Sequence, residues 1–123
     1  MHPIVLYIAA GMTALWGFAH LFAMKGVVKG FGALSEDNKR IITMEWIVEG
    51  VALISIAAFV LAATGIDPAS AGASAIYAVA IGSLILLAIV SLFTGFRVAS
   101  LPFRLCPFIF TAAALLIAWG AWL

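Results

Sequence analysis

The sequence predicts an all-α protein, a bundle of four transmembrane helices with both termini on the non-cytoplasmic side of the membrane. Hydrophobic residues make up 67% of the 123 positions and charged residues only 9%, with a mean hydropathy of +1.28. A soluble domain carries about 25% charged residues. A chain this apolar cannot cover itself with a polar surface, so lipid is its expected solvent. The predicted helices, in one domain, cover residues 4–24, 36–64, 74–96 and 101–122.

The first helix, residues 4–24, spans about 30 Å at 1.5 Å per residue, which is enough for one membrane crossing. Lys25 and Lys29 follow it, and Gly26 and Gly30 are expected to loosen the chain there. The N-terminal residues before it lack the basic segment of a cleaved signal peptide. We therefore expect this first hydrophobic stretch to be retained.

The second helix has a recognisable start. Ser35 is a good N-cap residue, and Glu36 and Asp37 place negative charge in the first turn, where the helix dipole favours it. We expect the helix to begin in water, to enter the membrane after Arg40 and to stop near Gly65.

The third and fourth helices are separated by a segment that contains two prolines. The third, residues 74–96, is followed by Arg97. A fourth helix that began at Pro107 would have only about 17 residues, at the short end for a membrane span. We therefore predict a start near Leu101, which makes Pro107 an internal kink.

Basic residues predict the orientation, because cytoplasmic loops of membrane proteins are enriched in lysine and arginine. With four spans, every basic residue falls on one side, which we assign to the cytoplasm. The aromatic residues Tyr7, Tyr77, Trp119 and Trp122 fall near the opposite interface, where such rings concentrate. We expect a multi-pass protein of a cell membrane, the inner membrane of a bacterium. The basic residues are Lys25, Lys29, Lys39, Arg40, Arg97 and Arg104.

Two carboxylates lie inside the second hydrophobic stretch. Glu45 and Glu49 are four residues apart, so they share one face of a helix. An ionisable side chain at membrane depth is costly and marks a functional site. His20 lies about one turn from the same end of the first helix, so antiparallel neighbours bring it to a similar depth. We predict a His20, Glu45 and Glu49 site and expect contact between the histidine and at least one carboxylate.

Other polar and aromatic side chains in the same half of the bundle are candidates for ligand binding. Trp16 shares a helix face with His20, and Trp46 neighbours Glu45. Cys106 is the only cysteine, so no disulfide can form within one chain, and we interpret it as an inert apolar residue. The predicted binding residues are Trp16, Trp46, Ser91, Thr94, Arg97 and Arg104.

Several functions remain open. We favour binding of a small lipophilic molecule with acid–base or redox-linked chemistry, which would make the protein an isomerase or oxidoreductase acting on a lipophilic substrate. The same three side chains are also typical of a proton-coupled transporter or channel subunit. A haem or a divalent metal at His20, Glu45 and Glu49 is a further alternative. In an accessory subunit, His20 would only hydrogen-bond a neighbouring helix, and Glu45 would pair with an arginine at the interface.

Two short segments carry a resemblance to a known family. Gly17-Phe18-Ala19-His20-Leu21-Phe22 and Glu49-Gly50-Val51-Ala52-Leu53 resemble the first two helices of small four-helix DoxX-like bacterial membrane proteins. That group includes a subunit associated with quinone reduction, so the resemblance implies a lipophilic partner. Small multidrug exporters carry their glutamate in the first helix, which has none here. The glutathione-linked membrane enzymes have an Arg-and-Asn motif in the second helix that is missing here.

The expected partners are the lipid bilayer, a small lipophilic molecule and further copies of the chain. A thin four-helix bundle with small residues around Gly82 predicts a dimer or trimer, because small side chains let membrane helices approach closely. The net charge of +1 and the lack of a basic stretch predict no nucleic-acid partner.

Overall fold

The computed structural model describes residues 1–123 and contains four long helices and no strand. All four are long and apolar enough to cross a membrane, so the predicted all-α membrane bundle is confirmed. A short 3₁₀ helix, η1, lies between the last two. The elements are α1 (Pro3–Gly30), α2 (Glu36–Ile66), α3 (Ala71–Phe93), η1 (Gly95–Arg97) and α4 (Leu101–Trp122).

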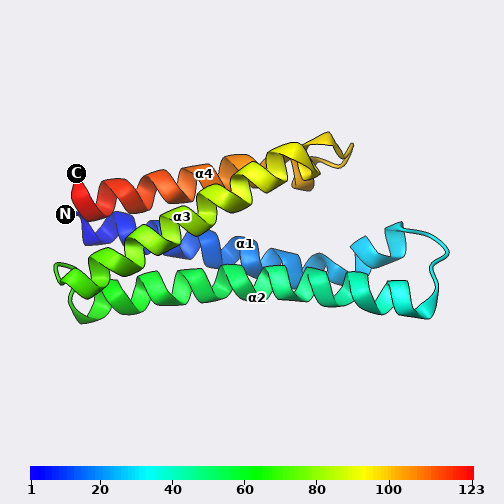
Figure 1. Ribbon diagram of the computed structural model, residues 1–123, viewed down its shortest axis with the longest axis horizontal. Helices are drawn as coiled ribbons and strands as arrows, with labels where there is room; N and C mark the ends of the chain where they lie inside the picture. Colours follow the sequence, from blue (N-terminus) through cyan, green and yellow to red (C-terminus); the bar gives the residue numbers. More distant parts are fainter.

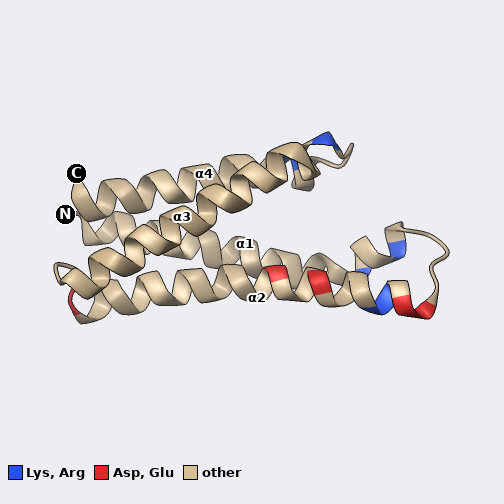
Figure 2. Ribbon diagram, viewed as in Figure 1, with Lys and Arg blue, Asp and Glu red and all other residues tan.

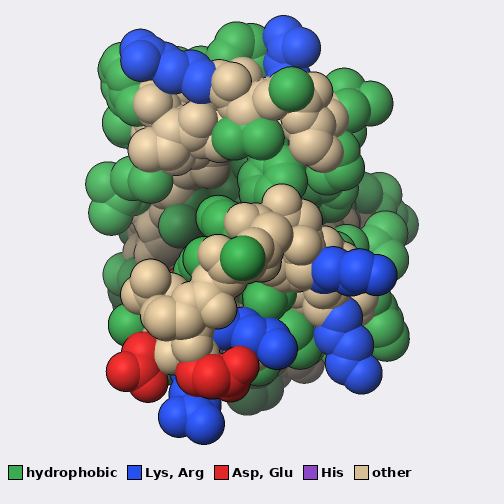
Figure 3. All heavy atoms as spheres, turned by 90° about the vertical axis from the view of Figure 1, so that its right-hand side faces the viewer, with side chains coloured by type: hydrophobic (Ala, Val, Ile, Leu, Met, Phe, Trp, Pro, Cys, Tyr) green, Lys and Arg blue, Asp and Glu red, His purple; other side chains and the backbone are tan.

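Successive helices run in opposite directions. Both chain termini and the α2–α3 turn lie at one end of the bundle, and the α1–α2 and α3–α4 connections lie at the other (Figure 1). All lysine and arginine residues are at this second end, which we call the basic end (Figure 2). Viewed onto that end, basic side chains stand around its rim and hydrophobic ones lie between them (Figure 3).

The end of the first helix was predicted too early. α1 continues through Lys25 and Gly26 to Gly30, six residues beyond the predicted end at Met24. Glycine costs a helix only about 1 kcal/mol relative to alanine, so two glycines do not stop it. Val28 lies in this extension and is buried, which gives the extra turns an apolar contact.

The second helix ends one residue beyond the predicted stop near Gly65. α2 continues to Ile66, and Asp67 is its C-cap residue. α3 begins at Ala71, three residues before the predicted start, because Ser70 caps it by accepting a hydrogen bond from the Ala73 N–H at 3.1 Å. α3 ends at Phe93, and the predicted last turn is the 3₁₀ helix η1 instead.

Two predicted helix starts are confirmed. Ser35 caps α2 by accepting a hydrogen bond from the Asn38 N–H at 3.2 Å. α4 begins at Leu101 and contains Pro107 in its interior. Because proline has no N–H, its position leaves the carbonyl of Phe103 without a helical partner.

The tightly packed part of the core lies away from the basic end. Its buried residues include Leu6, Tyr77 and Phe110, each at most 1% exposed, and many alanines. Thr64 and Tyr77 join α2 to α3 through a hydroxyl–hydroxyl hydrogen bond of 3.0 Å. Toward the basic end, the α3–α4 pair diverges from the α1–α2 pair (Figure 1).

The surface predicted for self-association is open in the single chain. Gly82 is exposed on α3, and a Cβ atom built there would meet nothing within 4 Å. The dimer or trimer stays a prediction.

Candidate functional site

Two glycines bring α1 and α2 into backbone contact. A Cβ atom on Gly17 would lie 2.8 Å from the carbonyl oxygen of Gly50 and 2.9 Å from Cγ1 of Ile54. A Cβ atom on Gly50 would lie 2.8 Å from Cδ2 of Leu21. Real Cβ atoms do not approach a backbone oxygen as closely as 2.8 Å, so position 17 requires glycine. At Gly50 the backbone contact is 3.0 Å, to the carbonyl oxygen of Gly17, which leaves little room for a side chain. The contact holds the next turn of α1, which carries His20, directly against α2.

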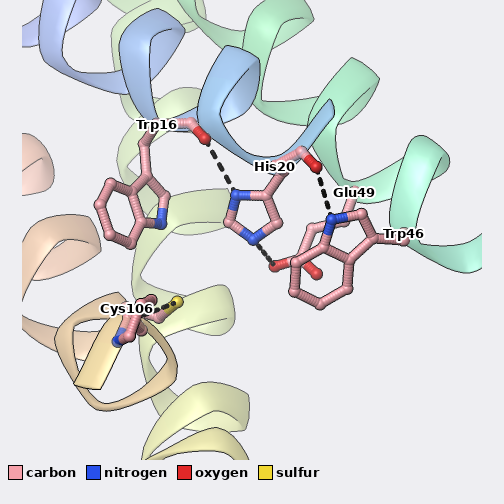
Figure 4. Close-up of polar contacts among 6 residues, drawn as sticks. Trp16, His20, Trp46, Glu49 and Cys106 are labelled. Carbon is pink, nitrogen blue, oxygen red and sulfur yellow. Dashed lines mark hydrogen bonds and ion pairs between the residues drawn. The ribbon is translucent and has the colours of Figure 1, made fainter. Parts of the chain in front are cut away.

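Both ring nitrogens of the His20 side chain face a polar partner. The side chain is buried, with 6% exposed. Its Nδ1 lies 2.9 Å from the carbonyl oxygen of Trp16. A carbonyl only accepts, so Nδ1 carries a hydrogen and donates it. The other nitrogen, Nε2, faces Glu49 with 3.4 Å between it and Oε1 (Figure 4).

These contacts bear on the protonation states that the His20–Glu49 pair can adopt. If the ring carries two hydrogens, it is an imidazolium facing a carboxylate. If it carries only the one on Nδ1, then Nε2 is an acceptor and faces a carboxylic acid. In both states one proton lies between Nε2 and Oε1, and the pair has no net charge. A neutral pair that can move a proton is the arrangement that tolerates membrane depth at the lowest cost.

Trp46 connects the histidine to α4. Its indole N–H donates to the backbone carbonyl of His20, and the two rings stack with centroids 4.9 Å apart. Phe103 of α4 meets the Trp46 ring edge-on at 5.5 Å. Trp16 meets the His20 ring edge-on at 6.0 Å. Four aromatic rings from three helices therefore form one continuous wall.

This aromatic wall borders a cavity of about 410 Å³ at the basic end. α1 contributes one face of the cavity, α2 contributes Trp46, and residues 100–106 close the far side. Nine of the twelve lining residues are hydrophobic. The exposed lining residues are Ala19, Ala23, Ser100, Leu101, Pro102 and Leu105, so Ser100 is the only polar side chain among them.

Two polar atoms of the cavity wall lie outside the His20–Glu49 pair. The indole nitrogen Nε1 of Trp16 is buried and has no hydrogen-bond partner. Cys106 is also buried, and its Sγ lies 3.6 Å from the carbonyl oxygen of Pro102, to which it donates weakly. Trp16 of α1 and Cys106 of α4 lie on the same side of the His20 ring in Figure 4, opposite Glu49 and Trp46.

The structure brings together four of the predicted site residues. His20 and Glu49 are in contact, and Trp16 and Trp46 line the cavity beside them. Glu45 is exposed on α2 and takes part in no ion pair. His20 and the two glutamates therefore do not converge, and no group of three histidine, cysteine or acidic side chains is placed to hold a metal ion.

The other four predicted binding residues lie away from the cavity lining. Thr94 is exposed and donates to the carbonyl of Val90, and Ser91 is half-buried on the same helix. Arg97 and Arg104 are exposed, and the Arg104 guanidinium lies over the Phe96 ring at 5.3 Å. Ser91 and Thr94 are separated from the site because α3 diverges from α2 toward the basic end. Arg104 is on α4, between the lining residues Phe103 and Leu105.

Several cavity residues were not among the predicted site residues. Ala19 and Ala23 follow the three–four spacing of the α1 face that also carries Trp16 and His20, so the sequence could have indicated them. Phe103 and Cys106 had no such signal, because the fold of the α3–α4 connection places them there.

Fold and site define a multi-pass integral membrane protein with a histidine–glutamate pair beside an apolar cavity. Comparison with protein-family models, curated proteins and solved structures finds no match for this chain.

Proposed function

We propose that this protein binds a small lipophilic molecule in the cavity at the basic end and performs acid–base chemistry on it through His20 and Glu49. The observation that carries the proposal is the position of His20. Its ring lines an apolar cavity of about 410 Å³ and lies 3.4 Å from the Glu49 carboxyl group. Small-molecule sites typically have volumes of about 300–1,000 Å³ and mostly apolar walls with a few polar groups.

The roles of His20 and Glu49 follow from which of the two side chains lines the cavity. His20 borders the cavity, whereas Glu49 lies behind the ring and is 35% exposed on its other side. Nδ1 of His20 donates to the carbonyl of Trp16, so the proton that can move is the one between Nε2 and Glu49. A bound molecule would take this proton from Nε2 or return it there, and the Glu49 carboxyl group would be the other group that can hold it. General acid–base catalysis of this kind contributes about 10²–10⁴-fold to a rate.

A proton-coupled transporter is supported less well. Alternating access to a site from both sides requires polar groups in both halves of the bundle. In the half opposite the basic end, the buried hydroxyls are already paired: Thr13 donates to Ala9, and Thr64 donates to Val60 and bonds Tyr77. The resemblance to DoxX-like proteins stays a prediction, and its implied lipophilic partner agrees with an apolar cavity.

The proposal is tested by filling the cavity. Ala23 lines the opening, so Ala23→Trp should occupy the space and prevent binding. We expect an organic extract of the purified wild type to contain one lipophilic compound in near-stoichiometric amount by mass spectrometry, and the extract of Ala23→Trp to lack it. Ala112→Trp is the matched control, because Ala112 is exposed on α4 and outside the cavity. Equal amounts of every compound in all three extracts would contradict the proposal.

We propose that the basic end faces the cytoplasm, which places both termini outside. The support is the gathering of all six lysine and arginine residues at that end. A reporter enzyme that works only outside the cytoplasm should be active when fused after Leu123, and a reporter that works only inside should be silent. The reverse pattern would place the cavity near the outer leaflet.

A further inference from the structure

A second cavity at the basic end differs in chemistry from the one beside His20. It lies between the last turns of α1 and the first turns of α2, and its volume is about 630 Å³. Lys25 and Lys29 line it from α1, and Lys39 lines it from α2. We call it the lysine cavity. It shares no lining residue with the cavity beside His20, so the two are separate features of the fold.

The lysine cavity carries an excess of positive charge. Glu36 is the only carboxylate that lines it, so three lysines against one glutamate give a formal net charge of +2. None of these four side chains takes part in an ion pair. A hollow lined mainly by charges of one sign concentrates the electric field and attracts ions of the opposite sign. The unpaired lysines therefore make this cavity a site for an anionic group.

The lysine cavity lies at the level of the lipid headgroups. The apolar stretch of α1 runs to Met24, and that of α2 begins at Ile41, so the three lysines stand just outside the hydrocarbon. Figure 2 shows these basic positions together at the α1–α2 connection. The orientation proposed above places them in the cytoplasmic leaflet, whose surface is negatively charged. The anion within closest reach is the phosphate of a membrane lipid.

A shallow groove continues from the lysine cavity along α2. Its volume is about 470 Å³, and residues that include Lys39 and Thr43 line both the cavity and the groove. The deep end of the groove consists of the exposed apolar side chains Met44, Ile47 and Val48. A phospholipid joins a charged headgroup to apolar acyl chains, so cavity and groove match its two parts. A free phosphate ion would use only the cavity.

We infer that the lysine cavity binds the headgroup of an anionic phospholipid, with an acyl chain along the groove on α2. Basic pockets between membrane helices are typical sites for such headgroups. The inference goes beyond the proposed function, since it assigns a different ligand to a different site. A bound lipid would also hold the end of α1 against the start of α2.

The inference is tested by native mass spectrometry of the purified protein from detergent micelles. Phosphatidylglycerol, which is anionic, and phosphatidylcholine, which has no net charge, are titrated separately, and the fraction of protein with one bound lipid gives each Kd. We expect phosphatidylglycerol to bind about tenfold more tightly or better. Each lysine near a headgroup contributes roughly a fivefold factor, so Lys29→Gln with Lys39→Gln should weaken this binding about 20-fold.

Two further double variants separate the cavity from the general charge of the basic end. Arg97→Gln with Arg104→Gln removes the same charge at the same end, outside the cavity and the groove, and should bind phosphatidylglycerol as the wild type does. Lys29→Arg with Lys39→Arg keeps the charge and should keep the binding. Equal losses in the two glutamine variants would overturn the inference, because the affinity would then depend on total charge.

Two more outcomes would overturn the inference. Equal affinities of the wild type for the two lipids would show that the lysines do not select an anion. Displacement of phosphatidylglycerol by inorganic phosphate at the same concentration would show that the acyl chains add nothing, so the cavity would be a site for a free anion. Both results would leave the proposed function at His20 unchanged, because that site is lined by other residues.

Discussion

Gly17→Ala is expected to destabilise the protein by about 1–3 kcal/mol and to abolish ligand binding, because α1 and α2 would have to separate. The new Cβ atom would lie 2.8 Å from the carbonyl oxygen of Gly50, and a backbone atom cannot move aside as a flexible side chain can. His20, three residues further along α1, would then move away from Glu49. Thermal unfolding in detergent measures the loss of stability, and mass spectrometry of the lipophilic compound extracted with the purified protein measures the loss of binding.

Gly11→Ala is the matched control for this experiment. Gly11 is on the same helix, and a Cβ atom there would meet nothing within 4 Å. Alanine favours a helix over glycine by up to about 1 kcal/mol, so this variant should be as stable as the wild type or more so. Equal stability of Gly17→Ala and Gly11→Ala would refute the close α1–α2 contact on which the site depends.

Glu49→Gln is expected to keep the fold and to remove the acid–base activity. A glutamine amide can donate to Nε2 of His20, so the contact survives, but the side chain no longer carries a titratable proton. The probe reaction is exchange of the methyl hydrogens of 2-acetylnaphthalene for deuterium in heavy water. We expect the wild type to accelerate this exchange and Glu49→Gln to lose about 10²-fold or more of the acceleration.

Glu45→Gln provides the comparison within the same helix. Glu45 lies one turn from Glu49, is exposed and has no ion-pair partner, so its replacement should change neither stability nor exchange rate. If both glutamine variants kept the wild-type rate, the carboxyl groups would have no part in the chemistry. The site would then be limited to binding.

Much of the fold was predictable because a membrane span is a local property. Length and hydropathy identify each helix without knowledge of its neighbours, and Ser35 marks the start of α2 by its own capping hydrogen bond. The end of α1 at Gly30 was harder to predict, because glycine is a weak stop signal. The additional turns include buried Val28, whose packing is not revealed by sequence spacing.

Only the part of the site that lies between the neighbouring helices α1 and α2 could be predicted from the sequence. Depth along the antiparallel helices α1 and α2 is enough to predict a contact between His20 and a glutamate of α2, and the structure has this contact at Glu49. It does not decide which of two glutamates points inward, and Glu45 points out. The contribution of α4 to the site could not be predicted in this way. Phe103 and Cys106 line the cavity because α4 packs against Trp46 of α2, a contact between helices that are not neighbours in sequence.

The central claim, that a lipophile binds beside His20, is tested most directly by photolabelling. A 2-acetylnaphthalene that carries a diazirine group would be irradiated with the protein in nanodiscs, and the adducts would be mapped by mass spectrometry of peptides. We predict adducts concentrated in residues 16–27 and 100–106, suppressed by unlabelled ketone and by Ala23→Trp. Adducts spread evenly over the lipid-facing surfaces of all four helices, with no suppression by the unlabelled ketone, would contradict the account.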